Sequence, residues 1–100
     1  MNPEQTAQCA ILIPAYKPDD RLPTYVEALK SAGVGKVVVV DDGSGEDYRA
    51  LFARIPQDGV TRVISYAPNR GKGEALRAGM RYLRDECPDQ PYVITADSDG

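Results

Sequence analysis

Apolar residues are spaced in two ways along this chain, and the two spacings alternate. Four short segments rich in apolar residues, typical of strands, occupy residues 9–13, 37–40, about 62–66 and 92–96. Three stretches with an apolar residue at every third or fourth position, typical of helices, occupy residues 22–29, 48–55 and 76–87. Gly33 follows the first of these stretches and Pro88 follows the last, where a helix is expected to end. The pattern predicts the element order β-α-β-α-β-α-β.

This order specifies the fold class, because strands that alternate with helices form a parallel sheet with helices on its faces. Four β-branched residues in a row, Val37 to Val40, predict a central strand that is buried on both sides. The buried face of the last helix is expected to carry Leu76, Met80, Leu83 and Cys87. We therefore predict an α/β fold with an open parallel, Rossmann-like sheet at residues 9–100, after an amino-terminal tail at residues 1–8.

The composition indicates a folded domain. Of the 100 residues, 42% are apolar and 27% are charged, and 15 acidic against 12 basic side chains give a net charge of −3. The chain is too apolar for a disordered tail and too evenly charged for an arm that wraps nucleic acid, so no nucleic-acid partner is expected. The absence of histidine excludes imidazole bases and directs any metal site toward oxygen ligands.

The chain shows no sign of a membrane or secretion segment. No apolar run approaches the roughly 18 residues that cross a bilayer. Residues 1–8 lack the basic and apolar segments of a secretion signal. We expect no membrane segment in this chain, a cytoplasmic location and reduced cysteines.

Each predicted strand is followed by a cluster of polar, glycine or proline residues. The four clusters lie at residues 14–16, 41–44, 69–73 and 97–100. The carboxyl ends of parallel strands meet at one edge of the sheet, and that edge is where open α/β sheets bind ligands. The sequence therefore predicts one binding site built from all four clusters.

The last cluster contains two carboxylates, Asp97 and Asp99, separated by one residue. In a turn both can face one hard cation such as Mg²⁺ or Mn²⁺ and leave coordination positions for phosphate oxygens. The alternative is an ordinary turn in which the two acids are solvated. The position directly after a strand favours the metal site.

The second cluster contains Asp41 and Asp42, followed by Gly43 and Ser44. For Asp42 we expect a ligand contact with a base N–H or a ribose hydroxyl. Asp41 fits a ligand contact and a helix cap about equally. Ser44 with Asp47 three residues later resembles a capping box for the next helix.

In the third cluster, Gly71, Lys72 and Gly73 begin the last predicted helix. Free N–H groups at a helix start and the Lys72 ammonium suit a diphosphate, although a plain helix-start turn explains the same residues. The spacing matches neither the phosphate-loop nor the dinucleotide-binding pattern. In the first cluster, Tyr16 is able to stack on a base or simply cover the sheet edge.

Together the four clusters, in this order, resemble the amino-terminal part of a family 2 glycosyltransferase, a group with the GT-A fold that includes dolichyl-phosphate-mannose synthases. The matching segments are Ile11-Leu12-Ile13-Pro14-Ala15-Tyr16, Val39-Val40-Asp41-Asp42-Gly43-Ser44, Asn69-Arg70-Gly71-Lys72-Gly73-Glu74-Ala75 through Gly79, and Thr95-Ala96-Asp97-Ser98-Asp99-Gly100. The resemblance covers nearly the whole chain and implies half of a GT-A domain.

The resemblance also implies roles for the site residues. Pro14, Ala15 and Tyr16 would line a nucleotide-base pocket, Asp42 would contact base or ribose, and Lys72 would lie near the base or phosphates. The Asp97 region would hold Mn²⁺ or Mg²⁺ on the donor diphosphate. Many members read Asp-Ala-Asp where this chain has Thr95-Ala96-Asp97. Asp97 therefore matches the second acid, and Asp99 a further position that ligates metal.

The implied reaction is an inverting, metal-dependent transfer of a sugar from a UDP- or GDP-sugar to a hydroxyl acceptor of unknown identity. No catalytic base is expected among these residues, because in the family it comes from a region beyond Gly100. The sequence ends directly after the fourth strand, so we expect the amino-terminal part of a longer domain, inactive alone. We also expect self-association through the uncovered flank of the sheet.

Alternatives from other classes remain at this stage. A receiver-like domain also has an acidic pair after a Val-rich strand, normally the first strand and not the second. A haloacid-dehalogenase-type phosphatase uses the pattern D-x-D-G of Asp97 to Gly100, normally at the start of its domain. A third alternative is that the chain is only a folding unit with no activity.

Overall fold

The computed structural model describes residues 2–98. The helices are α1 (Pro3–Ala7), α2 (Arg21–Ser31), α3 (Arg49–Ala53) and α4 (Lys72–Glu86), with a 3₁₀ turn, η1 (Glu46–Tyr48), before α3. The strands are β1 (Cys9–Ala15), β2 (Lys36–Asp42), β3 (Thr61–Tyr66) and β4 (Tyr92–Thr95). The predicted order of strands and helices is confirmed, and α1 lies in the stretch predicted as a tail.

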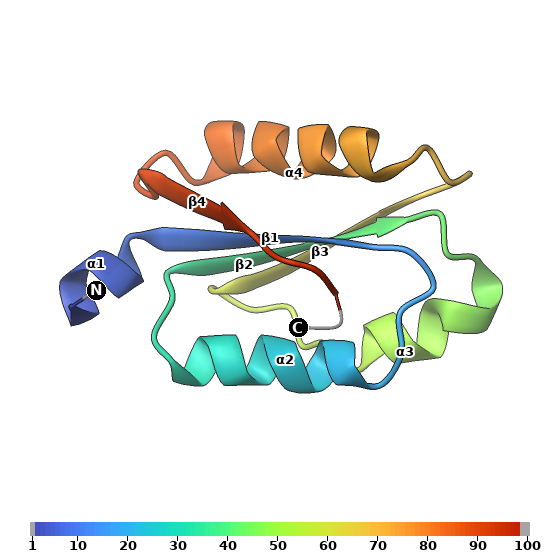
Figure 1. Cartoon of the computed structure of the whole chain (residues 1–100), viewed down its shortest axis with the longest axis horizontal. Helices are drawn as coiled ribbons and strands as arrows, with labels where there is room; N and C mark the ends of the chain where they lie inside the picture. Colours follow the sequence, from blue (N-terminus) through green and yellow to red (C-terminus); the bar gives the residue numbers. More distant parts are fainter. Residues whose placement is uncertain (1, 99–100) are drawn as a thin grey trace.

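The four strands form one parallel sheet in the order β3-β2-β1-β4. Figure 1 shows three layers, with α4 on one face of the sheet and α2 and α3 on the other. The predicted open parallel α/β fold is therefore confirmed. From β1 the chain adds β2 and then β3 on one side, and it adds β4 on the opposite side. The strand order thus reverses between β1 and β4, which makes that crevice the expected ligand site of an open α/β sheet.

The core has two halves because side chains alternate across the central strands. Toward α2 and α3, the buried residues are Ile11, Ile13, Ala15, Leu22, Val26, Val37, Val39, Phe52 and Ile55. Toward α4, they are Ala10, Leu12, Val38, Val40, Ala75, Leu83 and Cys87. The four valines of β2 are at most 1% exposed, which confirms the prediction of a central strand buried on both sides.

Two sequence-based expectations were wrong. Met80 was expected on the buried face of α4, but it is 48% exposed, and the helix instead packs Ala75, Gly79 and Leu83 against the sheet. The small residues at 75 and 79 allow α4 to approach the sheet closely. The face of the helix that contacts the sheet is therefore the one with these residues, and Met80 lies outside it. The capping box of Ser44 and Asp47 is also absent, since Gly45 precedes η1 without a side-chain cap bond.

At the flank of the sheet, β4 pairs only with β1 among the described strands. Tyr92 and Ile94 on this strand are 52% and 44% exposed. Self-association through this flank stays a prediction. Within residues 2–98, no helix has the length and apolar character needed to span a membrane.

The close approach of α4 to β1 at Gly79 yields a test of the packing. A Cβ at position 79 would collide with Cδ1 of the fully buried Leu12, whereas a Cβ at Gly73 in the same helix would meet no atom within 4 Å. We expect Gly79→Ala to lower the free energy of unfolding by about 1–3 kcal/mol, as overpacking does. Gly73→Ala is the matched control, with stability equal to or above wild type. Urea unfolding measures both, and equal midpoints for the two variants would contradict the packing.

Candidate nucleotide-binding site

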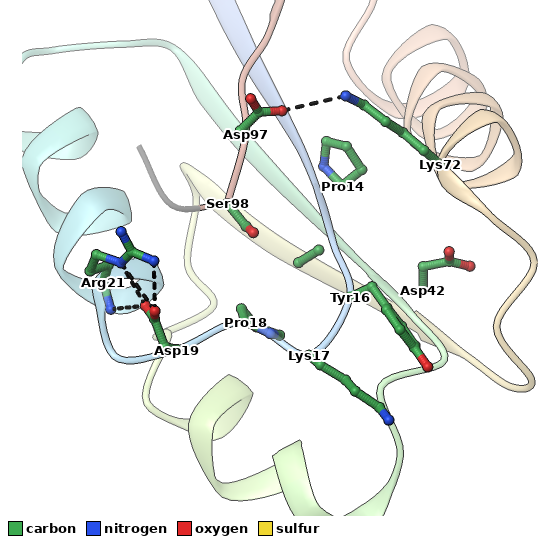
Figure 2. A pocket seen from close by; sticks show the side chains of 11 residues that line it. Pro14, Tyr16, Lys17, Pro18, Asp19, Arg21, Asp42, Lys72, Asp97 and Ser98 are labelled. Carbon is green, nitrogen blue, oxygen red and sulfur yellow. Dashed lines mark hydrogen bonds and ion pairs between the residues drawn. The ribbon is translucent and has the colours of Figure 1, made fainter.

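A pocket of about 440 Å³ opens at the carboxyl edge of the sheet. Its lining residues are Pro14, Ala15, Tyr16, Lys17, Pro18, Asp19, Arg21, Asp42, Lys72, Asp97 and Ser98. They come from the ends of β1, β2 and β4 and from the starts of α2 and α4 (Figure 2). The pocket therefore lies at the reversal of strand order between β1 and β4.

The structure brings together the six residues that the sequence predicted for nucleotide binding. Pro14, Ala15, Tyr16, Asp42, Lys72 and Asp97 all line the pocket. Asp99, the second predicted metal ligand, lies outside the described residues. The prediction missed Lys17, Pro18, Asp19, Arg21 and Ser98. The available signal was the continuation of the first cluster through Lys17, Pro18 and Asp19. Pro followed by Asp is typical of a turn, and the Arg21 backbone N–H donates to Asp19 Oδ1 at 2.9 Å.

Asp42 is the most highly bonded side chain of the site and is only 3% exposed. Its Oδ1 accepts from the Tyr66 hydroxyl at 2.6 Å and from the Arg70 backbone N–H at 2.8 Å. Its Oδ2 accepts from Asn69 Nδ2 at 2.8 Å and from the Gly71 backbone N–H at 2.9 Å. One carboxylate thus binds the end of β3, the following loop and the residue that precedes α4.

The same hydrogen bonds favour the ionised form of the Asp42 carboxyl. Burial raises the pKa of the Asp42 carboxyl, but hydrogen bonds from Tyr66 and from the N–H groups of Arg70 and Gly71 outweigh it, so the net pKa lies below the ordinary value. Burial and the bond to Asp42 raise the pKa of Tyr66 to about 12. The Arg70 guanidinium lies 4.7 Å from the centre of the Tyr66 ring. Asp42 is therefore a charged anchor at neutral pH.

Gly43 allows the loop after β3 to approach this anchor. Its φ is +67°, and a Cβ there would collide with the Asn69 backbone nitrogen and lie 2.5 Å from the Pro68 carbonyl carbon. A side chain at position 43 would therefore push away the loop that carries the donors to Asp42. This gives the Asp-Asp-Gly sequence a structural reason in addition to any ligand contact.

Asp41 and Ser44 connect the end of β2 to the loop after β1. Asp41 Oδ1 accepts from the Ser44 backbone N–H at 3.0 Å, and Ser44 Oγ accepts from the Lys17 backbone N–H at 2.9 Å. Asp41 therefore bonds within its own turn and not at a helix start. Of the two neighbouring acids, Asp41 organises one wall of the pocket, and Asp42 organises the opposite one.

Lys72 and Asp97 face each other across the pocket mouth (Figure 2). Lys72 Nζ lies 3.4 Å from Asp97 Oδ1, and the two side chains are 68% and 73% exposed. An exposed ion pair of this kind contributes little to stability. Both groups are therefore able to turn to a ligand without weakening the fold.

The metal prediction rests on Asp97 in the described part of the chain. Among residues 2–98, no three His, Cys, Asp or Glu side chains gather as a metal site. Mg²⁺ nevertheless commonly takes one or two carboxylates and fills its remaining positions with water and substrate phosphates, and Mn²⁺ also prefers carboxylate oxygens. The exposed Asp97 carboxylate is compatible in its chemistry with such a cation.

On the other side of the pocket, Asp19 and Arg21 form a two-pronged ion pair (Figure 2). The Arg21 side chain, then its backbone N–H, lower the pKa of Asp19 to about 2. With Lys17 and Lys72, the Arg21 guanidinium gives the pocket three cationic side chains. The lining therefore combines an aromatic ring, cations and a solvent-exposed carboxylate.

Fold and pocket together define an α/β protein with a pocket at the strand-order reversal of a parallel sheet. The chain belongs to glycosyl transferase family 2, whose family model matches residues 10–100. This match favours the glycosyltransferase interpretation over the receiver-like and dehalogenase-type alternatives.

Curated relatives agree with this family. The chain is 32% identical over 108 residues to human dolichyl-phosphate beta-glucosyltransferase, with 95% of this chain and 32% of the relative covered. The Drosophila melanogaster protein of the same name is 30% identical, with 93% and 31% covered. An undecaprenyl-phosphate 4-deoxy-4-formamido-L-arabinose transferase of Salmonella paratyphi B is 27% identical, with 90% and 28% covered. The chain thus spans about a third of the length of these relatives.

The four bonds to Asp42 predict a pH-dependent loss of stability in Asp42→Asn. The amide would present N–H groups to donors, which we expect to cost about 1–3 kcal/mol of unfolding free energy at pH 7. Because the pKa of Asp42 is lower in the folded chain than in the unfolded chain, where it is about 3.9, its contribution is present above that value. It is lost as the pH falls through the folded pKa.

Urea unfolding of wild type and Asp42→Asn between pH 7 and pH 3 measures how the stabilisation by the Asp42 charge depends on pH. The difference in unfolding free energy should be full at pH 7 and should shrink below about pH 4. Asp47→Asn, at an exposed position in η1, is the control and should match wild type throughout. A difference that persists unchanged in acid would contradict the assigned role of the Asp42 charge.

Proposed function

We propose that this chain is the donor-binding part of an inverting, metal-dependent glycosyltransferase that uses a UDP- or GDP-sugar. One observation carries the proposal: in a chain of glycosyl transferase family 2, residues from all four strand-end clusters, or directly beside them, meet around one pocket. The ligand that this lining suits has a planar base, two phosphates and a sugar.

Each part of such a donor has a counterpart in the lining. Tyr16, which is 50% exposed, offers its ring to the base. Lys72, at the first position of α4, offers an ammonium to the diphosphate. Asp42 is saturated by protein donors, so in this proposal its main effect on the nucleotide is to hold Lys72 and the loop before it in place.

Asp97, and Asp99 beyond the described residues, would hold Mn²⁺ or Mg²⁺. When bound, the cation would neutralise charge that develops on the leaving nucleoside diphosphate. Lys72 adds a positive charge beside Asp97. The protein's own contribution is therefore to orient the diphosphate and to stabilise it as a leaving group.

The acceptor is proposed from the relatives' names, which pair sugar transfer with dolichyl phosphate or undecaprenyl phosphate. We extend this to a phosphorylated lipid as acceptor, in place of the hydroxyl acceptor implied by the sequence motifs. The acceptor phosphate oxygen would form a bond to the anomeric carbon while the bond to the nucleoside diphosphate breaks. A phosphate monoester with a second pKa of about 6 is already ionised at neutral pH. The demand for a general base is then smaller than for an alcohol.

Nucleotide titration of the purified chain tests the donor proposal. We expect UDP or GDP with Mg²⁺ to shift the backbone amide signals of Tyr16, Lys72 and Asp97, with a Kd that is roughly millimolar. UMP and GMP, which have only one phosphate, and ATP, which carries adenine in place of uracil or guanine, serve as comparison ligands. Shifts confined to the amino-terminal edge of the sheet, or no shifts, would refute the site.

A paired substitution tests the cation. Asp97→Asn removes a charged hard ligand, so we expect it to weaken Mn²⁺ binding about tenfold or more, read as loss of paramagnetic broadening around the pocket. Asp89→Asn, an exposed acid in the turn after α4, is the control and should leave the broadening unchanged. Undiminished broadening in Asp97→Asn would overturn the assignment of this carboxylate.

A further inference from the structure

The first wall of the pocket contains a backbone conformation that the residue there does not favour. Lys17 has a φ of +49° and is the one non-glycine residue with a positive φ in the described part of the chain. Side chains other than those of Gly, Asn and Asp rarely enter this left-handed region. Lys17 also precedes Pro18, and a residue before proline is driven toward extended conformations. Something outside the turn must therefore hold it.

Ser44 provides that support from 27 residues away. Its Oγ accepts the Lys17 backbone N–H at 2.9 Å, and the side chain is only 6% exposed. Ser44 is itself fixed, because its backbone N–H donates to Asp41 Oδ1 at 3.0 Å. Asp41 is paired in register with Ala15, the last residue of β1. The bond thus ties the turn after β1 to the residues that follow β2.

The turn carries two side chains of the pocket. Tyr16 and Lys17 both line it, and Lys17 Nζ lies 5.3 Å from the centre of the Tyr16 ring (Figure 2). A change in the φ of Lys17 would rotate one of these residues relative to the other. The relative placement of the ring and the ammonium therefore depends on the bond from Lys17 to Ser44.

We propose that Ser44 is a positioning residue for donor binding, which acts by holding Lys17 in its left-handed conformation and so setting the wall formed by Tyr16 and Lys17. The proposal rests on the proposed function, since it assumes that this wall receives the nucleotide. It assigns to Ser44 a role other than the helix cap that its sequence position suggests. Ser44 itself needs no contact with the ligand.

The first experiment examines the turn without ligand. In Ser44→Ala, hydrogen exchange of the Lys17 amide should accelerate about tenfold or more, and the Tyr16 ring signals should shift, because the acceptor of the amide is gone. Ser31→Ala, at the exposed carboxyl end of α2, is the matched control and should change neither. If the Lys17 amide and the Tyr16 ring are unchanged in Ser44→Ala, the proposal is wrong, whatever the nucleotide does.

The second experiment separates the effect of the Lys17 backbone conformation from that of the Lys17 charge. It combines substitutions of Lys17 with Ser44→Ala. Lys17→Asn and Lys17→Gln both remove the ammonium, but Asn enters the left-handed region far more readily than Gln. With Ser44 present the two variants should bind UDP or GDP equally, because Ser44 holds the turn. In the Ser44→Ala background the Asn variant should bind about threefold to tenfold more tightly than the Gln variant.

The outcomes distinguish a failure of the proposed donor site from a failure of the proposed role of Ser44. A wild-type chain that binds neither UDP nor GDP refutes the proposed function, and the exchange data then still report whether Ser44 holds the turn. If nucleotide binds, but Ser44→Ala binds it as tightly as wild type, the positioning role is overturned while the donor site stands. Equal affinities of the Asn and Gln variants in the Ser44→Ala background would also overturn it.

Discussion

One buried carboxylate holds the binding edge of this protein together. Asp42 receives four hydrogen bonds, from a hydroxyl, an amide and two backbone N–H groups. Its donors are Tyr66 at the end of β3 and residues 69–71 directly before α4. An unpaired charge at 3% exposure would be strongly destabilising, so the loop has little freedom to leave. The start of α4, and with it Lys72, is fixed relative to the sheet by this interaction.

The neighbouring residues extend the same arrangement to the rest of the pocket. Gly43 provides the close approach of the loop to β2, and Asp41 and Ser44 reach the turn after β1. The four-residue sequence at positions 41–44 thus connects three of the four strand ends. The proposed donor site depends on this arrangement, since it positions both the turn with Tyr16 and the start of α4 with Lys72.

Much of the fold was predictable from local pattern, and the reasons are physical. The four valines of β2 predict a strand that is buried on both faces. The strand-end clusters lie at one edge of the sheet because parallel strands all point the same way. The partners of Asp42 were not predictable, because Tyr66 and Asn69 approach it only through the tertiary fold. The burial of Met80 was predicted wrongly, because the spacing of large apolar residues does not reveal that the small residues Ala75 and Gly79 face the sheet.

The central claim is that Asp42 is an ionised anchor, and the pKa of its own carboxyl tests it most directly. The chemical shift of the Asp42 side-chain carbonyl carbon, followed by NMR as the pH is lowered in the folded chain, reports this value. The account predicts a midpoint below that of an unperturbed Asp, about 3.9, because hydrogen bonds from Tyr66, Arg70 and Gly71 outweigh burial. A midpoint above that value would mean that burial outweighs the hydrogen bonds, and it would contradict the claim that these bonds stabilise the charged form of Asp42.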